Sequence, residues 1–134
     1  MKHIRITTDN EVSICEKEGM YTRDELATLI GEDCEYAETV MPRRLYSELG
    51  IPKIEAVMLV DEDGRMRDKP MNVLGSWLYE TDKHRTPIVG NVLITGFMQG
   101  SERNDVSDMK EEQLNHLYDF LMKIAKDIRR CRGE

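Results

Sequence analysis

The residues best suited to binding chemistry stand in one short segment of the chain. Lys83, His84 and Arg85 are consecutive, and they follow closely after Trp77 and Tyr79. An arginine beside an aromatic ring can hold a phosphate while the ring stacks on a nucleotide base. We therefore expect these five side chains to form a ligand site. The alternative is a solvent-exposed connection between two elements.

Arg43 and Arg44 are secondary candidates for ligand binding. They follow Pro42 in a half of the chain that is otherwise acidic. The alternative is that they pair with nearby carboxylates, such as those of Glu38 and Glu48. In that case their role would be structural.

No catalytic residues are expected. The serine in GSWLY does not sit in a GxSxG nucleophile motif, and the phosphate-binding patterns GxxxxGK[ST] and GxGxxG do not occur. His3 is predicted on the outer face of an edge strand, and His116 on the polar flank of the last helix. The sequence therefore favours a protein that binds without catalysing a reaction.

The cysteines indicate neither a disulfide framework nor a metal site. Cys15, Cys34 and Cys131 are odd in number and widely scattered, with no CxxC pair and no histidine at a ligand spacing. We expect all three thiols to be reduced. We also expect no bound metal and no cofactor.

Length and composition indicate one domain spanning residues 1–134. Hydrophobic residues make up 40% of the chain and charged residues 34%, which is typical of a folded, soluble protein. No apolar run is long enough to cross a membrane, and the first residues do not have the pattern of a signal peptide. We expect a cytoplasmic protein.

Negative charge is concentrated in the first half. The net charge is -7, and the whole acidic excess falls before residue 65. Broad nonspecific binding to DNA needs a basic surface, so it is not expected. The acidic half could present a face to a basic partner, or it could be a solvated surface that keeps the protein soluble.

The order of elements predicts an α+β fold. Apolar residues that recur at every second position predict strands at 2–8, 11–15, 34–40, 54–60 and 90–96. Apolar residues that recur every three to four positions, together with helix start and stop signals, predict helices at 22–31, 42–49, 72–79 and from 107 onward. The run ETDKHRT between them is predicted to be a polar loop. We expect a small, mostly antiparallel sheet of about five strands, with helices packed on one face and a long C-terminal helix.

Two helix starts have clear local signals. Thr22 followed by Glu25 fits a capping box for the helix at 22–31. Asn72 falls where the helix at 72–79 needs its amino-terminal cap. The Asn72 side chain is expected to accept a hydrogen bond from a backbone N–H two or three residues later. The Pro-Met-Asn step is therefore predicted to be architectural.

Four segments occur in an order that suggests a family. They are LATLIGEDCEYAETV, VMLVDEDGRMRDKPMNVLGSWLY, PIVGNVLITG and DVSDMKEEQLNHLYDFL. Together they resemble the small phage- and plasmid-associated family known as domain of unknown function thirty-eight forty-six. The chain departs from that pattern at Val73, where the family usually has a basic residue, and in a longer MPRRLYSELGIPKIE segment. The resemblance implies no catalytic residues. It implies an accessory protein of a mobile element that binds a host protein, a nucleic acid or a signalling nucleotide.

Three hypotheses for function follow. The first is a non-enzymatic binding module of phage or mobile-element origin, with a counter-defence role, that holds a host protein or a small nucleotide. The alternative is an acidic protein that interacts with a basic host surface or mimics a nucleic acid. The third, ranked last, is an enzyme of unrecognised type. An exposed hairpin edge could also pair two subunits as a homodimer.

Overall fold

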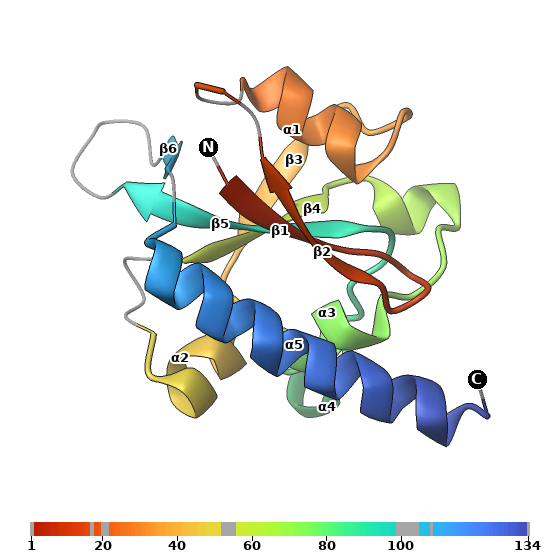
Figure 1. The fold of residues 1–134 in the computed structure, drawn as a ribbon. Helices are drawn as coiled ribbons and strands as arrows, with labels where there is room; N and C mark the ends of the chain where they lie inside the picture. The colour runs from red at the N-terminus through yellow and green to blue at the C-terminus, as the bar shows by residue number, and fades with distance from the viewer. Residues whose placement is uncertain are drawn as a thin grey trace.

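A sheet of five antiparallel strands lies at the centre of the protein (Figure 1). The computed structural model describes residues 2–16, 18–19, 22–51, 56–98, 105–107 and 109–133. The strands are β1 (Lys2–Ile6), β2 (Val12–Glu16), β3 (Ala37–Val40), β4 (Val57–Asp61) and β5 (Val92–Met98). Their spatial order is β2-β1-β5-β4-β3, so β2 and β3 are its two edges. The predicted start of the fourth strand, at 54–55, lies outside the described residues.

The helices follow the predicted order with two additions, the 3-10 turn η1 and the short helix α4. The helical elements are α1 (Arg23–Ile30), α2 (Arg43–Leu49), the 3-10 turn η1 (Gly64–Arg67), α3 (Val73–Leu78), α4 (Thr81–His84) and α5 (Glu111–Cys131). The α+β class is confirmed. The predicted polar loop after α3 contains the short helix α4, and an unpredicted strand, β6 (Asp105–Ser107), pairs with the end of β5.

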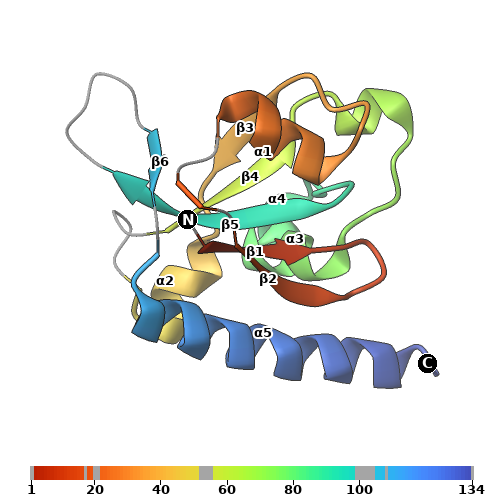
Figure 2. The same cartoon turned by 45° about the horizontal axis from the view of Figure 1, so that its top comes forward.

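Helices cover both faces of the sheet, so the prediction of helices on one face was wrong. In Figure 2, α1 lies on one side of the strands and α2 and α5 lie on the other. The reason lies in β4, whose five residues are all buried. Because successive side chains of a strand point to opposite faces, burial of all of them requires that both faces of the sheet be covered. A continuous apolar strand such as VMLV is the pattern of a strand with two covered faces.

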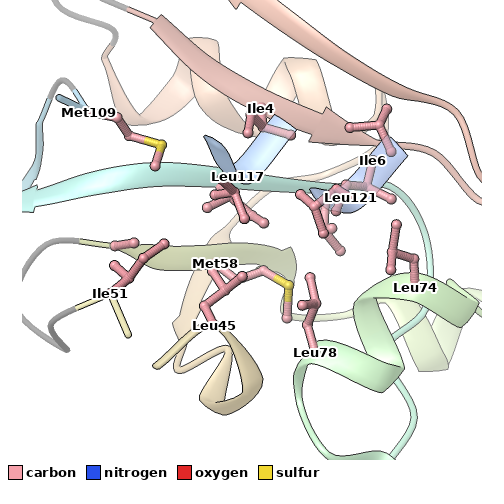
Figure 3. Close-up of a cluster of buried hydrophobic side chains, with 14 of the residues drawn as sticks. Ile4, Ile6, Leu45, Ile51, Met58, Leu74, Leu78, Met109, Leu117 and Leu121 are labelled. Carbon is pink, nitrogen blue, oxygen red and sulfur yellow. The ribbon is translucent and has the colours of Figure 1, made fainter. Parts of the chain in front are cut away.

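Each face has its own hydrophobic core. On the α1 side, Leu59 and Leu93 of the sheet pack with Leu26 and Ile30. The larger core lies between the sheet and helices α2, α3 and α5, and Figure 3 shows its side chains converging from all of these elements. It includes Ile4, Ile6, Leu45, Met58, Leu74, Leu78, Leu117 and Leu121. This core fixes the position of α3 and the segment that follows it.

The predicted hairpin is confirmed, but His3 is buried and not on an edge. Strand β1 lies between β2 and β5, and the His3 residue has no exposed surface. Burial, and then positive charge from the amino terminus and Arg5, lowers the pKa of His3 from 6.5 to about 4. The prediction failed because the sequence does not reveal which strand pairs with the second side of β1.

Both predicted helix caps are present. The Thr22 hydroxyl accepts from the Glu25 N–H at 3.1 Å, and the Glu25 carboxylate accepts from the Thr22 N–H at 3.1 Å. The Asn72 side-chain oxygen accepts from the Gly75 N–H at 2.8 Å. Among the described residues, no helix combines the length and the apolar character that crossing a membrane requires.

Asn72 also joins three segments of the core. Its amide nitrogen donates to the carbonyl oxygen of Ile6 at 3.1 Å and to that of Gly90 at 3.0 Å. The side chain is fully buried, and its donors and its acceptor are all used. The residue therefore connects the end of β1, the start of α3 and the approach to β5.

Candidate functional site

Trp77 and Tyr79 lie at the end of α3, where both are half-buried against the larger core. The Trp77 ring contacts Phe120 of α5, with the ring centroids 6.2 Å apart. The Arg44 guanidinium lies 4.9 Å from the centroid of the Trp77 ring. The Arg44 guanidinium therefore already occupies a position over the ring from which a base would stack on Trp77.

Arg44 holds α2 against the α3–α4 segment. One of its terminal nitrogens donates to the Trp77 carbonyl oxygen at 2.8 Å, and the two together bind the Asp82 carboxylate at 2.7 and 2.8 Å. These bonds to Asp82 raise the pKa of Arg44 and lower that of Asp82. The Arg44 side chain is only 14% exposed. The structure thus gives it a structural partner, although the partner is neither of the carboxylates that the sequence suggests.

The three basic residues after Tyr79 do not converge on one point. Lys83 pairs with Glu80 at 3.1 Å within the same turn. His84 ends α4, and its side chain is outside the described part of the structure. Arg85 is exposed and has a left-handed backbone, with φ of 64°. Only Tyr79 among the five candidates lines the described hollows.

A small cavity lies beside Tyr79, between the ends of β3 and β4 and the segment 86–89. Its volume is about 160 Å³. The wall is apolar at Val40, Val60 and Ile88, while Glu38 and Glu62 stand among its lining residues and are exposed. A cavity with exposed carboxylates among its lining residues favours a cationic group over a phosphate.

A second, shallower hollow continues from this cavity along β3. It is lined by Glu38, Val40 and Tyr79 again, and by Met41, Arg43 and Glu80. Arg43 is exposed here, unlike Arg44. The two secondary candidates therefore separate: Arg44 is part of the fold, and Arg43 borders the hollow.

A third hollow lies at the opposite face of the same edge strand. Asp24 of α1 and Glu35, Tyr36, Ala37 and Thr39 line it. Glu35 pairs loosely with Arg67 at 3.7 Å. Strand β3 is thus flanked by hollows on both of its faces, and carboxylates are found in each.

A charged cluster next to this edge has a different role. Lys69 donates to Asp33 at 2.7 Å and to Asp61 at 2.8 Å, and the Asp61 side chain is only 1% exposed. Burial opposes the charge on Lys69, but the two hydrogen bonds outweigh it and raise the pKa. Arg67 lies 4.0 Å from each carboxylate and supplies a second positive charge, so the cluster is a structural connection between the turn after α1 and β4. No local pattern in the sequence signals this cluster, since its members are far apart in the chain.

The residues predicted from the sequence did not include the carboxylates on either side of β3, namely Glu38 and Glu62 on one face and Asp24 and Glu35 on the other. We call this part of the surface the acidic edge. Glu38 and Glu62 are distant in the chain, but antiparallel pairing of β3 with β4 puts them on the same face. The excess of acidic residues before residue 65 was the available signal. Across the described residues, no group of three or more His, Cys, Asp or Glu side chains is arranged to hold a metal ion. No protein-family model, curated protein or solved structure matches the chain.

Proposed function

We propose that this protein is a non-enzymatic binding module that holds a basic segment of a partner protein at the β3 edge. The observation that carries the proposal is the cavity beside Tyr79, which has Glu38 and Glu62 among its lining residues. Its apolar wall can receive the hydrocarbon stem of a lysine or arginine, while the carboxylates receive the charged head.

The charges of the surroundings support a cationic partner. Glu38, Glu62 and Asp24 are exposed, and none of them forms an ion pair within the described residues. Arg43 is a cation at the far border of the second hollow. Carboxylates that lack a cation in the free protein can gain one on binding, at a small cost of desolvation because they are exposed.

The nucleotide version of the binding hypothesis has less support. Stacking needs an open aromatic face, and the Trp77 ring is in contact with Arg44 and Phe120. A phosphate beside the Trp77 ring needs an uncompensated cation there, but Arg44 is bound to Asp82 and Lys83 to Glu80. Arg85 is exposed, but it does not line the hollows described above. We therefore propose that the ligand is a segment of a protein and not a small nucleotide.

The biological setting belongs to the same proposal. The order of segments resembles a phage- and plasmid-associated family, which favours a cytoplasmic protein of mobile-element origin. Within that setting the partner would be a basic host protein, and the effect of binding would be counter-defence.

Charge reversal at the cavity tests the proposed function. The probe is a fluorescent octapeptide of alternating lysine and threonine, titrated by polarisation at low and at high salt. Glu38→Lys with Glu62→Lys should weaken binding by about ten-fold or more. The matched control is Asp119→Lys with Asp127→Lys, which makes the same change of charge on exposed residues of α5.

The control separates a local site from overall charge. Equal weakening by both double variants would mean that the peptide senses only the net charge, and would overturn the proposal. No binding of the peptide to the unchanged protein would overturn it as well. Heat on titration with nucleotides, by calorimetry, would favour the nucleotide hypothesis instead.

A further inference from the structure

The outer edge of β3 has backbone groups that point away from the sheet. The Glu62 N–H donates to the Tyr36 carbonyl oxygen at 3.1 Å, which makes these two a hydrogen-bonded pair. In an antiparallel ladder the bonded pairs alternate, so Glu38 and Val40 also bond to β4. The N–H and C=O groups of Ala37 and Thr39 must then face outward. No described strand pairs with that side of β3.

The protection of this edge against an added strand is incomplete. Proteins commonly protect edges with charge, with proline or with a covering segment. Here a charge is present at Glu38, but large apolar side chains are exposed at both ends of the strand. Tyr36 is 66% exposed and Met41 is 36% exposed. Such residues beside an unpaired backbone favour an interaction surface.

The hollows on the two faces fit the side chains of one extended segment. Successive side chains of an added strand point alternately to the two faces of the sheet. On one face they reach the cavity with Glu38 and Glu62, and on the other they reach the hollow with Asp24 and Glu35. The cavity volume of about 160 Å³ corresponds to roughly five water molecules, which suits one long side chain.

A second copy of this protein is a poor occupant of the edge. If Ala37 of one copy pairs with Thr39 of another, Glu38 faces Glu38 of that copy, and facing like charges destabilise a ladder. A basic strand brings complementary charge to the same positions. The occupant that the chemistry selects is therefore a foreign segment with lysine or arginine at alternate positions.

We infer that the partner binds by strand addition: an extended basic segment pairs with the outward backbone of Ala37 and Thr39 and inserts a lysine or arginine beside Glu38 and Glu62. This inference rests on the proposed function and specifies how that function is carried out. Main-chain hydrogen bonds would supply the affinity, and the acidic hollows would select the sequence.

Backbone methylation of the octapeptide separates strand addition from charge attraction alone. Two methylated forms keep the same side chains and charge, one with N-methyl groups on every threonine and one on every lysine. In an added antiparallel strand only alternate N–H groups face β3, and these belong to the residues that share a face with Ala37 and Thr39. With lysines in the cavity, those residues are the threonines. Methylation of the threonines should weaken binding about ten-fold or more, and methylation of the lysines should leave it nearly unchanged.

The outcomes distinguish the two proposals. If the parent peptide binds and the two methylated forms bind equally, strand addition is wrong, but binding of a basic partner stands. If the parent does not bind, both are wrong.

Thr39→Pro provides a second test within the protein, because it removes an outward N–H and no bond to β4. The Thr39→Pro substitution should weaken binding of the parent peptide, while the far-ultraviolet circular dichroism of the protein stays unchanged. Self-association of the free protein that Thr39→Pro abolishes would identify a second copy as the occupant and overturn the inference.

Discussion

The guanidinium of Arg44 lies 4.9 Å from the centroid of the Trp77 ring, and this contact makes two of the candidate ligand residues parts of the fold. The same side chain binds the Asp82 carboxylate through two hydrogen bonds. It therefore connects α2 with the end of α3 and with α4. The surface left for a partner is the acidic edge next to this connection.

Arg44→Ala should destabilise the protein, because it removes the pair with Asp82, the bond to the Trp77 carbonyl and the contact with the ring. We expect the free energy of unfolding to fall by about 1–3 kcal/mol, since Arg44 is mostly buried. Urea unfolding followed by far-ultraviolet circular dichroism measures this. Arg43→Ala is the matched control, and its effect should be within about 0.5 kcal/mol because Arg43 is exposed. Equal effects of the two variants would contradict the structural role.

Asn72→Asp separates the capping role of this residue from its role as a donor. The carboxylate can still cap α3, but it cannot donate to the carbonyl oxygens of Ile6 and Gly90. We expect a loss of about 2 kcal/mol or more at neutral pH. Stability should partly recover as the pH falls, because a protonated carboxyl can donate and its pKa in the folded protein is raised.

Asn115→Asp is the control for this change, since Asn115 is exposed on α5. Chemical unfolding of both variants from pH 7 down to pH 4 gives the comparison. An Asn72→Asp protein as stable as the Asn115→Asp protein would show that the two donor bonds contribute little.

These residues also show what the sequence could and could not predict. The Thr22–Glu25 and Asn72 caps were predictable, because each signal lies within one helical turn. The pairing of Arg44 with Asp82 and of Lys69 with Asp33 was not, because it depends on how separate elements pack. The two-sided burial of β4 was readable from its continuous apolar run, but the strand order that buries His3 was not. The acidic edge needed both the charge bias and the β3–β4 register.

His3 should make the protein less stable in mild acid. Its pKa in the fold is about 4, below the ordinary 6.5, so the unfolded chain takes up a proton that the folded protein excludes. The stability due to neutral His3 is complete above pH 6.5 and is lost as the pH falls toward 4. In this window His3 contributes up to about 1.4 kcal/mol per pH unit to the pH dependence of the free energy of unfolding. His3→Leu should flatten the pH dependence of unfolding in this window, and His116→Gln should not. An unchanged slope in His3→Leu would contradict the burial of a neutral imidazole.

The three thiols should differ in reactivity. Burial, and then the neighbouring Asp61, raises the pKa of Cys34 to about 11, whereas Cys131 is exposed. A thiol reagent at pH 8 should label Cys131 rapidly and Cys34 only after unfolding, because the thiolate is the reactive form. Cys15 is half-buried and should react at an intermediate rate. Single Cys→Ser variants assign each phase. Labelling of Cys34 as fast as that of Cys131 would mean that the core around α1 is open.

Amide hydrogen exchange at β3, with and without the lysine–threonine octapeptide, tests the central claim most directly. In the free protein the Ala37 and Thr39 amides should exchange faster than those of Glu38 and Val40, which bond to β4. Saturating peptide should slow Ala37 and Thr39 by about ten-fold or more and leave Glu38 and Val40 nearly unchanged. Bound peptide with no added protection at Ala37 and Thr39 would contradict strand addition at this edge.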